Sequence, residues 1–158
     1  MTIRYDDQVA IVTGSGNGLG RSHALALASR GAKILVNDLG GSVTGDGASS
    51  AAALETVAMI EAAGGEAMAN SANVAKMDQV EAMVAQAVEK WGRVDILVNN
   101  AGILRDKSFV KMGMNDFQLV VDVHLMGSAN CSKAVWQLMR EQGYGRIVMT
   151  TSSSGMYG

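Results

Sequence analysis

The chain has 158 residues, of which 48% are hydrophobic, and its 13 Lys and Arg against 15 Asp and Glu leave a net charge of -2. This charge argues against nucleic acid as a partner, and the length suits one core better than two independent domains. No apolar run reaches the ~18 to 20 residues of a membrane span, and the first residues lack the apolar stretch of a signal peptide. The sequence therefore predicts a soluble, cytoplasmic protein with no membrane partner, and the single cysteine, Cys131, fits a reducing compartment.

Short apolar runs alternate along the chain with longer Ala-rich segments of helical period. This alternation predicts an α/β fold with a doubly wound parallel sheet of the Rossmann type. Strands are expected at 9–12, 33–37, 67–70, 95–98 and 146–150. Helices are expected at 19–30, 48–63, 77–90 and 115–141, and Gly127 could divide the last of them.

Signals for helix ends accompany these segments. A glycine that can adopt the left-handed conformation follows each predicted helix, namely Gly31, Gly64, Gly92 and Gly143. Asp78 with Glu81, and Asn115 with Gln118, resemble capping boxes at the starts of the third and fourth helices. The third helix carries one apolar stripe, which predicts that it lies on the sheet; the stripe comprises Val80, Met83, Val84, Ala87, Val88 and Trp91.

A glycine cluster at residues 13–20 joins the first predicted strand directly to the first predicted helix. Glycines let the backbone turn sharply and approach a pyrophosphate, while the amides and dipole at the helix start favour negative charge. An ordinary tight turn is the alternative, but the position between strand and helix favours a dinucleotide site. The candidate cofactor-binding residues here are Gly14, Ser15, Asn17, Gly18, Leu19 and Gly20.

Asp38 ends the second predicted strand, about 20 residues after the glycine cluster, where dinucleotide-binding folds carry an acidic residue. Its carboxylate can accept hydrogen bonds from a ribose 2′-hydroxyl and would repel a 2′-phosphate. No basic residue interrupts the glycine cluster or directly follows Asp38. The predicted cofactor is therefore NAD rather than NADP.

These motifs resemble the short-chain dehydrogenase/reductase family. Thr13, Gly14, Gly18 and Gly20 match its Thr-Gly-x-x-x-Gly-x-Gly motif, and residues 99–102 match its Asn-Asn-Ala-Gly motif. The resemblance implies the strand order 3-2-1-4-5 in one dinucleotide-binding domain over residues 1–158. It also implies cofactor contacts that composition alone does not give, from Asn73, Val74, Asn100, Ala101 and Gly102.

Four segments are similar to one branch of that family, the (3R)-hydroxyacyl-CoA dehydrogenases of D-bifunctional (multifunctional) enzymes and their bacterial relatives: 36–41, 99–109, 123–125 and 144–150. The similarity implies an oxidoreductase that moves a hydride between NAD and a secondary alcohol or ketone, with a 3-hydroxyacyl-CoA as substrate. Another substrate, such as an acyl carrier protein thioester or a small alcohol, stays open. A non-catalytic module that only binds NAD is a third interpretation.

The resemblance also assigns candidate catalytic residues. Ser152 stands where the family has the serine that holds the substrate oxygen, although a run of serines is also typical of a polar loop. His124 replaces the family's usual asparagine, and could serve a proton relay or only pack in a helix. The Tyr-x-x-x-Lys motif is not found, because Tyr157 is followed by Gly158 alone, and the chain is therefore interpreted as truncated. His23 is expected to be structural. The two histidines are far apart in the sequence and there is one cysteine, so no set of metal ligands is predicted.

The segment 115–141 has more apolar positions than one sheet-facing stripe needs, which predicts a second buried face. In the resembling family the matching helices pair between subunits, so a homodimer or homotetramer is expected. The strand at 146–150 is expected to be an open sheet edge, and the 158-residue chain alone should then associate or be poorly soluble.

Overall fold

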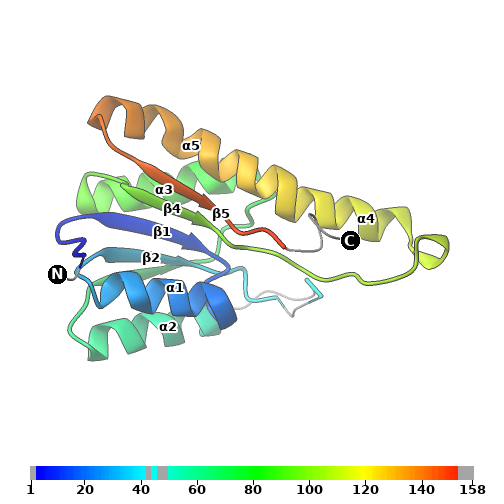
Figure 1. Ribbon diagram of the computed structural model, residues 1–158, viewed down its shortest axis with the longest axis horizontal. Helices are drawn as coiled ribbons and strands as arrows, with labels where there is room; N and C mark the ends of the chain where they lie inside the picture. Colours follow the sequence, from blue (N-terminus) through cyan, green and yellow to red (C-terminus); the bar gives the residue numbers. More distant parts are fainter. Residues whose placement is uncertain (1–2, 42–43, 46–49, 153–158) are drawn as a thin grey trace.

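The computed structural model describes residues 3–41, 44–45 and 50–152, in which strands and helices alternate as predicted (Figure 1). In chain order the elements are β1 (Val9–Thr13), α1 (Gly18–Ala28), β2 (Lys33–Asn37), α2 (Ala51–Ala62), β3 (Ala67–Asn70), α3 (Met77–Trp91), β4 (Ile96–Asn99), the 3₁₀ turn η1 (Phe109–Lys111), α4 (Met114–Val121), the π-helical turn η2 (Asp122–Met126), α5 (Gly127–Gln142) and β5 (Arg146–Met149).

The five strands form one parallel sheet in the order β3-β2-β1-β4-β5, which confirms the predicted order 3-2-1-4-5. Val9 lies opposite Lys33 and Ala10 opposite Ile96, so β2 and β4 flank the central strand β1. Because all strands are parallel, their carboxyl ends meet at one edge, where loops between strands and helices can build a common site.

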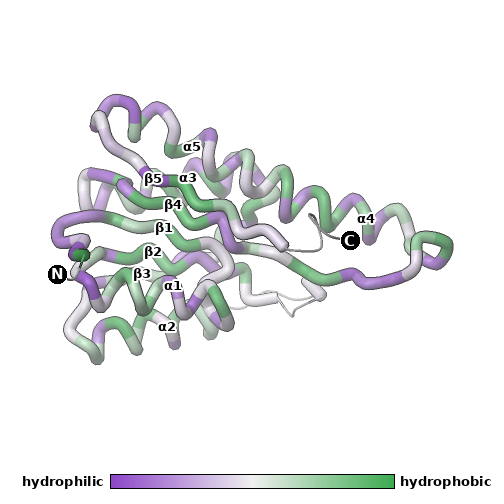
Figure 2. Tube along the Cα trace, viewed as in Figure 1, coloured by the Kyte–Doolittle hydropathy of each residue, from purple (hydrophilic) through white to green (hydrophobic). Residues whose placement is uncertain are grey.

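Alternate residues of the strands supply two cores, one on each face of the sheet. Val9 and Ile11 of β1 pack with α3 and α5, whereas Ala10 and Val12 pack with α1 and α2. Figure 1 shows these helix pairs on opposite sides of the sheet, and Figure 2 shows the mainly hydrophobic strands between them. The predicted stripe of α3 is confirmed, since its members are buried or packed against the first core.

Asp95 was expected to start a strand but lies just before β4, although its N–H still bonds the Val9 carbonyl and its carbonyl accepts from the Arg146 N–H. It is fully buried, and its carboxylate accepts hydrogen bonds from the Val9 N–H at 2.9 Å and from both Nε and Nη2 of Arg93. Asp95 thereby joins the starts of β1 and β4, and the carboxylate raises the pKa of Arg93. The pair places the two strands that carry the glycine turn and the Asn-Asn-Ala-Gly segment side by side.

The glycines after the four predicted helices have positive φ, as predicted, with 99° at Gly31, 82° at Gly64, 77° at Gly92 and 66° at Gly143, which follows α5. The predicted capping boxes are wrong: α3 is preceded by Lys76 and α4 by Gly113, with no side-chain cap in either case. Asp78 and Asn115 lie inside their helices, because the turn before each helix starts the hydrogen bonding earlier. Of the second predicted helix, residues 48–49 lie outside the described residues.

The expected long helix is continuous, and Gly127 does not break it. A π-helical turn at Asp122–Met126 joins α4 to α5, and the Ser128 hydroxyl donates to the His124 carbonyl at 2.7 Å. The second apolar face of this segment is not buried within the chain, since Phe117 is 44%, Leu125 65% and Trp136 55% exposed. No helix in the part of the chain that the structure describes has the length and apolar character needed to cross a bilayer.

Candidate active site

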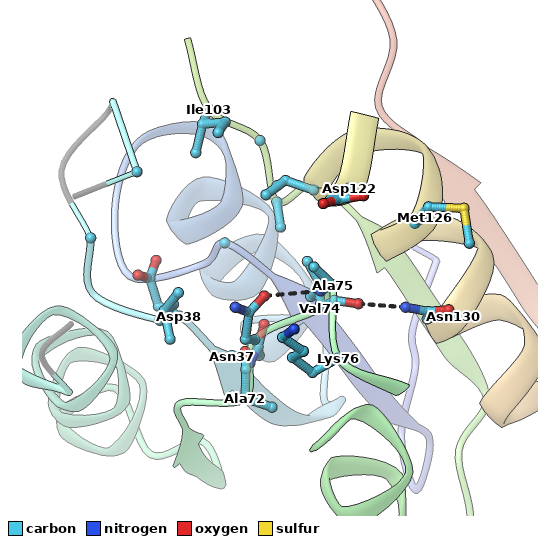
Figure 3. A pocket seen from close by; sticks show the side chains of 18 of the residues that line it. Asn37, Asp38, Ala72, Val74, Ala75, Lys76, Ile103, Asp122, Met126 and Asn130 are labelled. Carbon is cyan, nitrogen blue, oxygen red and sulfur yellow. Dashed lines mark hydrogen bonds between the residues drawn. The ribbon is translucent and has the colours of Figure 1, made fainter. Parts of the chain in front are cut away.

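A cavity of about 730 Å³ opens at the carboxyl ends of the strands. It is bordered by the glycine turn, the ends of β2 and β4, the loop after β3, and the helical segment around η2. Figure 3 shows Asp38 on one side of it and Met126 and Asn130 on the opposite side. Of the predicted cofactor-binding residues, the lining includes Gly14, Asn17, Asp38, Asn73, Val74, Asn100, Ala101 and Gly102.

The glycine turn brings its backbone close to the end of β4. Gly14 has a φ of 62°, and a Cβ there would lie 2.8 Å from the Ala101 Cα. A Cβ at Gly20 would overlap the Gly14 carbonyl oxygen, so α1 starts tightly against the turn. Asn17 precedes α1 without a side-chain cap, which leaves the first-turn amides for an anionic ligand.

Four residues predicted in this turn do not line the cavity: Ser15, Gly18, Leu19 and Gly20. Ser15 is fully buried, and its hydroxyl donates to the Val12 carbonyl at 2.7 Å. Leu19 is 67% exposed at the start of α1. Ser15 therefore supports the turn through the backbone, and a cofactor role for either side chain stays a prediction.

Asp38 is held at the cavity by two backbone amides. Its Oδ2 accepts from the Gly16 N–H and its Oδ1 from the Gly40 N–H, each at 2.7 Å. Each carboxylate oxygen has more than one lone pair and can accept a further hydrogen bond. The carboxylate is thus fixed in orientation without being saturated.

Gly16 carries a second set of contacts that the sequence did not reveal. Its carbonyl accepts from Arg21 Nε at 2.8 Å and from the Thr56 hydroxyl at 3.1 Å, while its N–H binds Asp38. A Cβ at Gly16 would lie 2.7 Å from both the Ala52 Cβ and the Asp38 Oδ2. The position of Arg21 directly after Gly20 could have indicated its contact with the glycine turn. Thr56 is fully buried on α2, and no sequence signal indicated its contact with Gly16.

The Thr13 hydroxyl connects the glycine turn to the segment after β4. It accepts from the N–H groups of Asn100 and Ala101, both at 3.0 Å, and donates to the Val98 carbonyl at 3.3 Å. The Asn100 amide donates in return to the carbonyls of Thr13 and Gly14 at 3.0 Å. This mutual bonding explains why both motifs lie at one end of the cavity.

The loop after β3 and the start of α5 form the far wall. Asn73 Oδ1 accepts from the Ala75 N–H at 2.9 Å. Asn130 Nδ2 donates to the Val74 carbonyl at 3.0 Å (Figure 3). A Cβ at Gly127 would lie 2.7 Å from the Val74 Cγ2. Helix α5 thus packs directly on the loop that lines the cavity.

His124 lies on η2 beside the segment after β4. Its Nε2 is 3.0 Å from the Ile103 nitrogen and 2.9 Å from the Ile103 oxygen, and a Cβ at Gly102 would lie 2.7 Å from its Cε1. The ring therefore holds the backbone at Ile103, and a relay role stays a prediction. Ser152 follows β5, is exposed and does not line the cavity. It lies at the carboxyl-end edge of the sheet, where the cavity also opens and where the nearby Thr150 N–H bonds the Asn99 carbonyl.

Other reactive groups lie apart from the cavity. His23 is exposed on α1, and burial raises the pKa of the Cys131 thiol to about 12. Within residues 3–41, 44–45 and 50–152, no three His, Cys, Asp or Glu side chains gather as they would around a metal ion. Tyr157 lies outside the described residues.

A dinucleotide fits these residues. The cradle at Gly14 has no room for a side chain, the start of α1 offers uncapped amides, and Asp38 offers oriented acceptors. A family model described as short chain dehydrogenase matches residues 8–158. The chain belongs to the short-chain dehydrogenase family.

Known members of the short-chain dehydrogenase family are similar along almost the whole chain. Peroxisomal multifunctional enzyme type 2 of Drosophila melanogaster is 55% identical over 99% of this chain and 26% of its own length. A 3-oxoacyl-[acyl-carrier-protein] reductase of Synechocystis is 46% identical over 96% of this chain and 58% of its own. The solved structure of a 7α-hydroxysteroid dehydrogenase, in complex with NADH and 7-oxo glycochenodeoxycholic acid, has a TM-score of 0.88 and 32% identity over 98% of this chain and 57% of that one.

These comparisons confirm the predicted family and the predicted resemblance to multifunctional enzymes. The chain spans between about a quarter and three fifths of the lengths of these relatives. The residues of this short-chain dehydrogenase that contact cofactor and substrate stay predictions.

Proposed function

We propose that this chain is the cofactor-binding part of an NAD-dependent oxidoreductase that moves a hydride between NAD and a secondary alcohol or ketone, with a 3-hydroxyacyl-CoA as substrate. The observation that carries the proposal is the Asp38 carboxylate, fixed by the Gly16 and Gly40 amides beside an uncapped helix start. This arrangement suits a ribose hydroxyl next to a pyrophosphate.

The preference for NAD follows from charge. A 2′-phosphate placed at Asp38 would bring two anions together at a site where both carboxylate oxygens are already held. The nicotinamide supplies the hydride acceptor or donor when the cofactor is bound. The glycine turn and the amides at the start of α1 bind the pyrophosphate, and Asn100, Ala101 and Gly102 border the space toward β4.

The chemistry at the substrate is assigned to residues beside that space. Ser152 donates a hydrogen bond to the substrate oxygen, and His124 fixes the backbone at Ile103 through Nε2. A thioester substrate is supported by the name of the Synechocystis relative, a 3-oxoacyl reductase, and coenzyme A by the resemblance to multifunctional enzymes. The cytoplasmic location and the homodimer or homotetramer stay predictions.

The test is a turnover assay with 3-hydroxyacyl-CoA and either NAD or NADP, in a version of the protein in which the Tyr-x-x-x-Lys motif follows this chain, together with calorimetric titration of each cofactor. NAD should bind at least roughly tenfold more tightly than NADP, and Asp38→Ala should weaken NAD and reduce that ratio. Asp78→Ala, which removes a carboxylate from the first turn of α3, is the matched control.

Equal affinity for the two cofactors would contradict the role of Asp38. NAD binding with no turnover of 3-hydroxyacyl-CoA, acyl carrier protein thioester or small alcohol would favour a non-catalytic NAD-binding module. Turnover of the carrier-protein thioester or the small alcohol alone would keep the enzyme class and replace the substrate.

A further inference from the structure

Arg21 directly follows the glycine cluster in the sequence, and the fold brings its side chain against Gly16, the residue that holds Asp38. Arg21 leaves α1 toward the start of α2, and its Nε donates to the Gly16 carbonyl at 2.8 Å. The Gly16 N–H is the group that holds Asp38 Oδ2 at 2.7 Å. One glycine residue therefore separates the guanidinium from the carboxylate that faces the ribose.

Glu55 on α2 neutralises this guanidinium. Arg21 Nη2 lies 2.8 Å from Glu55 Oε2 and Nη1 lies 3.5 Å from Oε1, so the two planar groups face each other. The Arg21 side chain is 20% exposed and the Glu55 side chain 63%. An ion pair this exposed contributes little to folding stability, so stability alone does not account for the pairing.

The anchor of Arg21 does not depend on Glu55. Arg21 Nε bonds the Gly16 carbonyl and the buried Thr56 hydroxyl, at 2.8 and 3.0 Å, whether or not its other nitrogens are paired. If Glu55 lost its charge, the guanidinium would stay beside the glycine turn with two nitrogens able to donate. Such a fork is well suited to a phosphate.

The geometry points to Glu55 as a second determinant of cofactor selectivity, which withholds Arg21 from the 2′-phosphate of NADP. Asp38 repels that phosphate directly, and Glu55 forms an ion pair with Arg21, the cation that would otherwise attract the phosphate. This inference rests on the proposed binding of NAD at the glycine turn. Selectivity is then shared between the end of β2 and the exposed side of α2.

The test measures dissociation constants of NAD and NADP by calorimetry in the protein with Glu55→Gln, which keeps the shape and removes the charge. NADP should bind about fivefold more tightly, and NAD should change less than about twofold, because only NADP carries the extra phosphate. The gain should shrink at high salt, since the guanidinium is partly exposed. Glu61→Gln, an exposed carboxylate further along α2, is the control and should leave both constants unchanged.

A third variant, Glu55→Gln with Arg21→Gln, separates this mechanism from a general change in charge. It should lose the gain in the NADP to NAD ratio, with the NAD constant reporting any loosening of the turn. If NADP affinity does not rise in Glu55→Gln, or rises equally without Arg21, the inference is wrong. If the unmodified protein binds neither cofactor, the proposed function fails and this inference with it.

Discussion

Replacing Thr13 by valine tests whether the link between the glycine turn and the segment after β4 stabilises the site. The Thr13 side chain is 1% exposed, and its hydroxyl makes three hydrogen bonds, which is its full capacity. Valine keeps the shape but leaves the N–H groups of Asn100 and Ala101 without that acceptor.

The expected cost follows from these two groups. A buried donor left without a partner costs about 1 to 3 kcal/mol, and both residues are half-buried, so the lower part of that range applies to each. The free energy of unfolding should fall by about 2 to 3 kcal/mol, which corresponds to roughly 5 to 10 °C in Tm for a chain of this size. NAD should also bind more weakly, because Ala101 borders the cavity.

Urea and thermal unfolding of the two Thr13 variants, valine and serine, give the comparison. Serine keeps the hydroxyl and removes one buried methyl, at a cost of about 1 kcal/mol. Equal stability of Thr13→Val and Thr13→Ser would contradict this expectation, because the hydroxyl would then contribute nothing that a methyl does not.

Three further outcomes are expected. Ser152→Ala should lower turnover by ~10² to 10³ and leave NAD affinity intact, by analogy with the loss of an oxyanion donor. Ser29→Ala, at the far end of α1, is the control and should change neither turnover nor affinity. Unaltered turnover in Ser152→Ala would reject the assignment. Because burial raises the pKa of Cys131 to about 12, iodoacetamide at pH ~8 should alkylate it only after unfolding, and rapid alkylation of the native protein would show an accessible thiolate. Light scattering should find the 158-residue chain associated through β5, where Val148 is 49% and Met149 52% exposed, or through the α4 and α5 face; a monodisperse monomer would contradict both.

The elements and the cofactor turn were predictable because their signals are local. Asp38 follows the glycine cluster at a characteristic spacing, and the strands show in short apolar runs that a parallel sheet buries on both faces. Residues that meet only after folding gave no such signal. Thr56 reads as an ordinary position of α2, yet it bonds Gly16 across 40 positions of sequence.

The wrong predictions have equally specific causes. The capping boxes place the caps at Asp78 and Asn115. The first helical hydrogen bonds instead go to the carbonyls of Lys76 and Gly113, so each cap position lies two residues earlier. The π-helical turn at Asp122–Met126 carries no glycine or proline that would mark it. Its contacts are with distant segments, since His124 bonds the backbone at Ile103 and Gly127, directly after it, packs on Val74.

The contact between Gly127 and Val74 makes the width of the cavity adjustable in evolution. Helix α5 stands against the cavity wall at a distance set by the absence of a single methyl group at residue 127. A larger residue there requires the Val74 side chain or the start of α5 to move, and both Val74 and the neighbouring Met126 line the cavity, whereas the glycine turn on the other side is not touched. A substitution at residue 127, far in the sequence from the glycine turn, can therefore change the shape of the cavity while the phosphate-binding turn stays the same.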